Sequence, residues 1–177
     1  MKYIFWCAYE HLDFRIPEFE ALSQLFNIEL KWIDKNKTHP WVIIDLPSAD
    51  SAKLLCSRSI STKICAQLWI ESDKNLISFH EDLKNYCDKN DLKFDKDISF
   101  KIQVETFMKR LSMQERLVKI ESFEYLPVQG PVKLDKPDVT FVAFEFYGFD
   151  HNNLPEEPLH LFFGKFVAEG QRELITK

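Results

Sequence analysis

Apolar residues in the first part of the chain recur with the spacing of short strands and amphipathic helices. Four strands are predicted, at residues 3–9, 28–33, 41–46 and 62–69. Pro17 fits the first turn of a helix, where a missing N–H costs nothing, and Ser48 can cap a second helix. The residues expected to face inward are Phe19, Leu22, Leu25 and Phe26 in the first helix and Ala52, Leu55 and Cys56 in the second.

The remaining residues predict a second set of elements, after a boundary near residue 70. Ser72 precedes a helix with Leu76, Phe79, Leu83 and Tyr86 on one face. A charged linker at 88–97 leads to an alternating strand at 98–105. Ser112 and Glu115 form a capping box that opens a helix, with Met113, Leu117, Ile120 and Phe123 expected inward. Residues 138–147, apolar on both faces, predict a central strand, and 159–167 predict the last one.

The first set of elements has the order βαββαβ, which is the ferredoxin-like order. We therefore predict an α+β chain with two domains: a ferredoxin-like domain at residues 1–70 and an α/β domain at 71–177. The length of 177 residues and an apolar content of 45%, with 16 phenylalanines, are enough to bury two small cores.

Charge and cysteine usage narrow the function classes. The formal net charge of -5 has the wrong sign for a general nucleic-acid binder, so any RNA contact must come from a local patch. The four cysteines include no C-x-x-C pair, which argues against zinc and favours reduced thiols in a cytoplasmic protein. The apolar run at 3–9 is too short to span a membrane, so we expect no membrane partner.

Two groups of residues could carry chemistry. The run Glu10–Arg15 is either an acid/base or phosphate-contact site, or a structural cluster in which Asp13 caps a helix and Arg15 pairs locally; we favour the structural interpretation. Lys109 and Arg110 precede the Ser112 cap, where cations and a helix N-terminus suit a phosphate. The candidates for RNA contact are Lys101, Lys109, Arg110, Lys133, Lys136, Lys165 and Arg172. Ordinary solvated charges are the alternative, since acidic residues are interspersed among them.

Several motifs resemble a known family. The run V-K-L-D-K-P-D-V at 132–139, followed by an apolar strand, resembles the signature of the THUMP domain, an RNA-binding module of tRNA-modifying enzymes. Segments 10–18 (E-H-L-D-F-R-I-P-E), 120–130 (I-E-S-F-E-Y-L-P-V-Q-G) and 163–174 (F-G-K-F-V-A-E-G-Q-R-E-L) resemble, in order, the catalytic subunit of the eukaryotic tRNA (guanine-10-N2) methyltransferase. Departures from the family pattern are Val128, Ala143, Phe144 and Phe146, which put a particular RNA-facing surface in doubt.

The resemblance implies a division of labour within a longer protein. In that family a ferredoxin-like domain and a THUMP domain precede a Rossmann-like domain that methylates guanosine 10 with S-adenosylmethionine. The THUMP region grips the tRNA acceptor end, and a small zinc-binding activator subunit docks on the catalytic domain. This chain has no G-x-G turn and no Pro-Pro, so we expect neither a methyl-donor site nor catalytic or metal-binding residues here.

Two other interpretations stay open. The THUMP module could belong to a thiouridine synthetase or a deaminase, which the downstream sequence would decide. Alternatively, the chain is a stand-alone ferredoxin-like enzyme or ligand-binding protein using His11, Asp13 and Arg15, although no glycine-rich anion loop lies at residues 9–17.

Overall fold

The computed structural model describes residues 1–174, which form two units. The first unit comprises Met1–Leu68 and the C-terminal segment from Phe166 on, and the second comprises Trp69–Lys165. The structure confirms the α+β class and the predicted order of elements. The predicted second domain, 71–177, differs from this division at its C-terminal end, because the chain returns to the first unit after Lys165.

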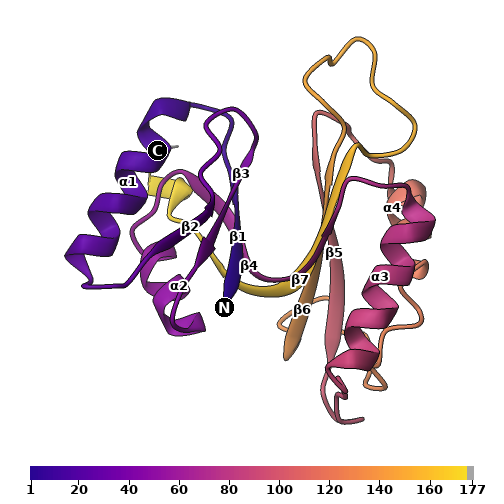
Figure 1. Cartoon of the computed structure of the whole chain (residues 1–177). Helices are drawn as coiled ribbons and strands as arrows, with labels where there is room; N and C mark the ends of the chain where they lie inside the picture. The colour runs from indigo at the N-terminus through magenta and orange to yellow at the C-terminus, as the bar shows by residue number, and fades with distance from the viewer. Residues whose placement is uncertain (175–177) are drawn as a thin grey trace. The chain divides into compact units, whose positions relative to one another are not determined.

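The first unit has the ferredoxin-like topology. Its elements are β1 (Lys2–Cys7), α1 (Leu12–Leu25), β2 (Lys31–Asp34), β3 (Trp41–Asp45), α2 (Ala49–Cys56) and the first part of β4 (Thr62–Ser72). The strand order is β2-β3-β1-β4, and β1 is antiparallel to both β3 and β4, with Phe5 opposite Val42 and Cys65. Both helices lie on the same side of these strands (Figure 1).

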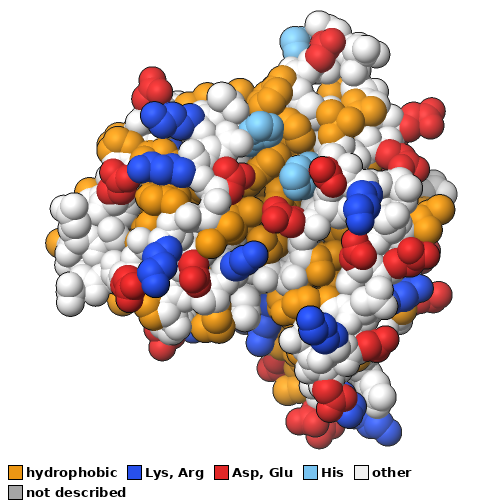
Figure 2. Space-filling model, in the orientation of Figure 1, with side chains coloured by type: hydrophobic (Ala, Val, Ile, Leu, Met, Phe, Trp, Pro, Cys, Tyr) orange, Lys and Arg blue, Asp and Glu red, His pale blue; other side chains and the backbone are white. Residues whose placement is uncertain are grey.

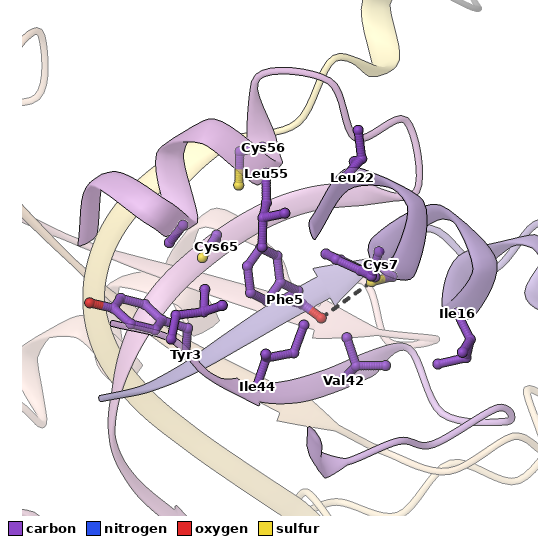
Figure 3. Packing of buried hydrophobic residues seen from close by; sticks show 13 residues of the cluster. Tyr3, Phe5, Cys7, Ile16, Leu22, Val42, Ile44, Leu55, Cys56 and Cys65 are labelled. Atoms are coloured by element: carbon purple, nitrogen blue, oxygen red, sulfur yellow. Dashed lines mark hydrogen bonds between the residues drawn. The ribbon is translucent and has the colours of Figure 1, made fainter. Parts of the chain in front are cut away.

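Every second side chain of β1 contributes to the hydrophobic core of this unit. Tyr3, Phe5 and Cys7 share one face of the strand and pack against residues of β3, α1 and α2 (Figure 3). Figure 3 also shows Cys7 against the Phe5 carbonyl, to which its thiol donates at 3.3 Å. Burial raises the pKa of the Cys7 thiol to about 12, and all four cysteines are buried and free. The thiols therefore behave as small apolar side chains, as their scattered spacing predicted.

Helix α1 begins earlier than the sequence predicted. Its first residue is Leu12, and Pro17 lies inside the helix instead of in its first turn. The N-cap is His11 in a left-handed conformation (φ 51°), with no side-chain cap, so Asp13 does not take the capping role expected of it. A pattern of apolar residues does not report this start, because the turn before it is fixed by backbone conformation at a non-glycine residue.

The second unit pairs strands in both directions. It contains the last part of β4, α3 (Leu76–Lys89), β5 (Phe100–Phe107), α4 (Met113–Glu121), β6 (Val139–Phe146) and the first part of β7 (His160–Glu169). A short 3₁₀ helix, Arg172–Leu174, follows β7 in the first unit. Strand β6 lies between β5, which it pairs in parallel, and β7, which it pairs antiparallel. The predicted central position of residues 138–147 is thus correct.

Helices α3 and α4 lie on one face of the β5-β6-β7 strands (Figure 1). The core beneath them includes Phe79, Leu83, Val104, Phe141 and Phe163. The capping box of α4 is present: the Ser112 side chain accepts from the Glu115 N–H, and the Glu115 carboxylate accepts from the Ser112 N–H. The predicted inward stripe of α4 is partly wrong, because Met113 is 88% exposed and Leu117 is 52% exposed.

Candidate nucleic-acid interface

The loop at residues 130–138, which carries two of the predicted lysines, is held by hydrogen bonds at the start of β5 and β6. Its first part lies beside β5, where the Phe100 N–H donates to the Pro131 carbonyl at 3.0 Å and the Lys133 N–H donates to the Phe100 carbonyl at 2.9 Å. Its end is held by Asp138, whose Oδ2 accepts from the Ser99 N–H at 2.8 Å and from the Ser99 hydroxyl at 2.7 Å. These hydrogen bonds from Ser99 lower the pKa of Asp138, which therefore stays ionised. The loop is held at both ends.

Gly130 makes this close approach possible. A Cβ added there would lie 1.8 Å from the Ile98 carbonyl oxygen, a distance no side chain tolerates. The glycine in the G-P pair of the sequence is therefore required by packing of backbone on backbone.

The fastened loop brings three predicted residues to one end of the parallel strands. Lys133 and Lys136 are exposed on the loop, and Lys101 follows Phe100 on β5 and is half-buried. Phe100 and Ile102 pack toward α3 and α4, so the alternation of the strand puts Lys101 on the opposite face. We call Lys101, Lys133 and Lys136 the lysine group. Asp135 is the exposed carboxylate nearest to it in sequence.

Lys109 and Arg110 lie beyond the other end of β5, about 20 Å along the strand from Lys101. Lys109 Nζ donates to the Glu156 carbonyl at 3.2 Å and lies 4.7 Å from the centre of the Tyr147 ring. Arg110 is exposed. The expected phosphate cradle at α4 is already occupied in part, because Glu115 accepts from the Ser112 N–H and that bond lowers the pKa of Glu115.

The last two predicted residues lie on other elements than the lysine group. Lys165 pairs with Phe141 across β6 and β7, which puts it on the face of the strands that carries α3 and α4. Arg172 belongs to the first unit, where its Nη2 lies 3.4 Å from Glu10 Oε2. Acidic and basic side chains alternate over the face drawn in Figure 2, so no single-sign area marks an interface there.

Within the Glu10–Arg15 cluster, Arg15 has a structural role, whereas Glu10, His11 and Asp13 are exposed. Arg15 is 1% exposed, and its guanidinium donates to the backbone carbonyls of His39 at 2.6 Å and Ala8 at 3.2 Å. Glu18, also buried, accepts from the Ile60 N–H at 2.7 Å and the Ser61 N–H at 3.2 Å. The buried charges of Arg15 and Glu18 therefore hold loops of the first unit in place.

Sequence reasoning missed a polar network under α4. Lys119 Nζ donates to Glu145 Oε1 at 2.8 Å, and the Tyr147 hydroxyl donates to Glu145 Oε2 at 2.6 Å. Burial and the Glu145 carboxylate raise the pKa of Tyr147. A lone glutamate inside the apolar run F-V-A-F-E-F was the available signal, since a buried carboxylate requires a partner.

Two classes of site receive no support from residues 1–174. Their His, Cys, Asp and Glu side chains nowhere gather in a group of three that could hold a metal ion. Among the described helices, none has the length and apolar character needed to cross a bilayer.

Comparison with protein families and curated sequences gives consistent matches. Residues 1–172 match the model of the Tmrp11 THUMP N-terminal domain. The chain is 37% identical over 178 residues to tRNA (guanine(10)-N(2))-methyltransferase TRMT11 of Bos taurus, covering 98% of this chain and 38% of that protein. It is 29% identical over 180 residues to the tRNA (guanine(10)-N(2))-methyltransferase of Saccharomyces cerevisiae, covering 99% of this chain and 41% of that protein. The chain thus spans about two fifths of the curated relatives.

Solved structures share the fold. PH1313 from Pyrococcus horikoshii Ot3 superposes with a TM-score of 0.54 at 10% identity, over 96% of this chain and 56% of that one. TrmN from Thermus thermophilus superposes with a TM-score of 0.51 at 15% identity, over 96% of this chain and 46% of that one. At these identities the likeness concerns the fold alone.

Proposed function

Because this chain belongs to the family of Tmrp11 THUMP N-terminal domains, we propose that it is the tRNA-binding region of an S-adenosylmethionine-dependent tRNA (guanine(10)-N2)-methyltransferase. The observation that carries the proposal is the 37% identity to TRMT11 of Bos taurus over 98% of this chain. In this role the chain docks the acceptor end of the tRNA, and the methyl transfer to the guanosine N2 amine takes place on another domain.

The chemistry is assigned to the part of the relatives that this chain does not span. The chain covers 38% of TRMT11 from Bos taurus, and we place the methyl donor and the catalytic residues in the remainder. The zinc-binding activator subunit would dock on that remainder too, and the assembly would act in the cytoplasm. The relatives from Bos taurus and Saccharomyces cerevisiae are both named tRNA (guanine(10)-N(2))-methyltransferases. This favours the proposal over a thiouridine synthetase or a deaminase.

We assign the main phosphate contacts to the lysine group. Lys101 lies at the start of β5, and the loop that carries Lys133 and Lys136 is held there by backbone hydrogen bonds and by Asp138. A loop that is already held in one conformation loses little conformational entropy on binding. Its cations therefore contribute more to affinity than cations on a mobile loop would. Arg110 is a further contact of this proposal. Lys109 and Arg172 are weaker candidates because they have internal partners, and Lys165 is weaker because it lies on the face of the strands that carries α3 and α4.

The test is a titration of tRNA with an intact acceptor end against the chain at several salt concentrations. Replacing both Lys133 and Lys136 by glutamine should weaken binding and reduce the dependence of log K on log salt by about two phosphate contacts. The matched control replaces Lys37 and Lys53, both exposed in the first unit, and should leave the slope unchanged. Equal slopes for the two double variants would refute the assignment of the lysine group.

A further inference from the structure

The second unit contains a pocket of about 400 Å³. Its lining comes from α3, the residues around α4, β6 and β7, and the loop before β7. The apolar residues of the lining are Leu76, Phe79, Leu111, Val118, Phe123 and Leu161, and the polar or charged ones are His80, Lys109, Gln114, Glu115, Lys119, Ser122, Glu145 and Glu156. Val118, on α4, is 60% exposed and lies at the mouth of the pocket.

The polar groups at the bottom of this pocket already have partners. Both oxygens of Glu145 are occupied, by Lys119 and by Tyr147. His80 Nδ1 lies 2.7 Å from the Tyr125 hydroxyl, and burial lowers the pKa of His80, which favours its neutral form. The interior of the pocket therefore offers apolar contact, and no buried polar group in it calls for a polar ligand.

The charges around the mouth are arranged unevenly. The two lysines of the lining have internal partners: Lys109 donates to the Glu156 carbonyl, and Lys119 pairs with Glu145. Two other carboxylates of the lining, those of Glu115 and Glu156, are exposed. With the Lys119–Glu145 pair neutral, these two carboxylates outnumber the one remaining ammonium group of the lining, that of Lys109. The mouth thus presents negative charge to solvent, which repels a phosphate backbone.

We propose that this pocket docks a protein partner, taking one large aliphatic or aromatic side chain from a segment flanked by lysine or arginine. An apolar anchor in a preformed pocket supplies most of the binding energy in such contacts. The flanking cations complement the open carboxylates and fix the orientation of the segment. This inference does not rest on the tRNA proposal, because the pocket lies away from the lysine group and carries the opposite charge.

The probe is a fluorescein-labelled short peptide with a central Leu-Phe pair flanked on both sides by lysines, titrated with the full chain. Val118→Glu should lower its affinity about tenfold, because a charged side chain replaces an apolar contact of the anchor. Met113→Glu is the matched control: it makes the same change at an exposed apolar position of α4 that does not line the pocket, and it should leave the affinity unchanged. If Val118→Glu unfolds, Val118→Ser provides the same comparison.

Three further measurements separate the possible occupants. A peptide with alanines in place of Leu-Phe, or with glutamates in place of the lysines, should bind more weakly, and Glu156→Gln should lower affinity for the lysine peptide while Glu124→Gln should not. Equal binding of these peptides, or displacement of the probe by tRNA, would overturn the proposal. So would self-association that Leu134→Ser abolishes, because Leu134 is 80% exposed between Lys133 and Lys136 and would then be the anchor from a second copy.

Discussion

Buried charged residues in this fold bind main-chain groups of loops. Arg15 and Glu18 lie on adjacent turns of α1, and each forms hydrogen bonds with main-chain groups of a distant loop. Their roles were not visible from the sequence, because the carbonyls and amides they meet belong to residues 8, 39, 60 and 61. The sequence did favour a structural interpretation of the cluster, but it assigned the wrong partners.

Replacing Arg15 by alanine should lower the free energy of unfolding by about 3 kcal/mol, because two backbone carbonyls lose their donor and a buried volume is emptied. Urea unfolding followed by tryptophan fluorescence measures this. Arg58→Ala, at an exposed position, is the control and should change stability by less than about 0.5 kcal/mol. Equal stability of the two variants would return the cluster to the functional interpretation.

Asp138 gives the fold a pH dependence of known sign. Its pKa is lowered in the folded state, so its contribution to stability is present above the unfolded value of about 3.9 and is lost as the pH falls through the folded value. Asp138→Asn should therefore be less stable than the parent at neutral pH, with a difference that shrinks in acid. Asp135→Asn, an exposed change in the same loop, should show no such convergence when urea midpoints are compared across pH.

Elements were predictable where their signal is local. The capping box of α4, the central place of β6 and the βαββαβ order follow from short-range spacing and were confirmed. The orientation of α4 was not, because Met113, Leu117 and Ile120 form an apolar stripe that only its neighbours can place: Ile120 packs on the core while Met113 stays in solvent. The pocket beside Val118 depends on contacts among α3, α4 and β7, which no single segment encodes.

Gly130 offers a test of whether the position of the loop that carries Lys133 and Lys136 matters for tRNA binding. Gly130→Ala should destabilise the second unit and weaken tRNA binding together, because the added methyl group meets the Ile98 carbonyl and must displace the loop that carries Lys133 and Lys136. Gly148→Ala is the control: it is strained by a positive φ of 93°, but it lies on another loop. We expect Gly148→Ala to cost about 1 kcal/mol of stability and to leave the salt dependence of tRNA binding unchanged.

On the scale of the whole molecule, the first unit is built from both ends of the chain. Val167 and Ala168 pack against its core, the Gly170 N–H donates to the Lys63 carbonyl at 3.3 Å, and the Gln171 N–H donates to the Ser59 carbonyl at 2.7 Å. A Cβ at Gly170 would lie 2.1 Å from the Thr62 carbonyl oxygen. The predicted boundary at residue 70 falls two residues from the observed division, but pairing of a C-terminal segment with the first unit leaves no mark in local spacing.

A polypeptide of residues 1–70 should therefore be less stable than the same polypeptide joined by a flexible linker to residues 166–174. The added segment restores the packing of Val167 and Ala168 and the two backbone hydrogen bonds. Urea midpoints of the two polypeptides measure the difference. A control in which Gly170 of the added segment is replaced by valine should lose the gain, and equal midpoints for all three would contradict the prediction.

The return of the chain after Lys165 also sets an order of events during synthesis. A ribosome releases the first seventy residues before the strand segment that completes their unit exists, and the whole of the second unit must emerge in between. The second unit has all of its own strands and helices in one continuous stretch, so it can fold while the first waits. Of the two units, the one whose synthesis starts first is thus the one that is completed second.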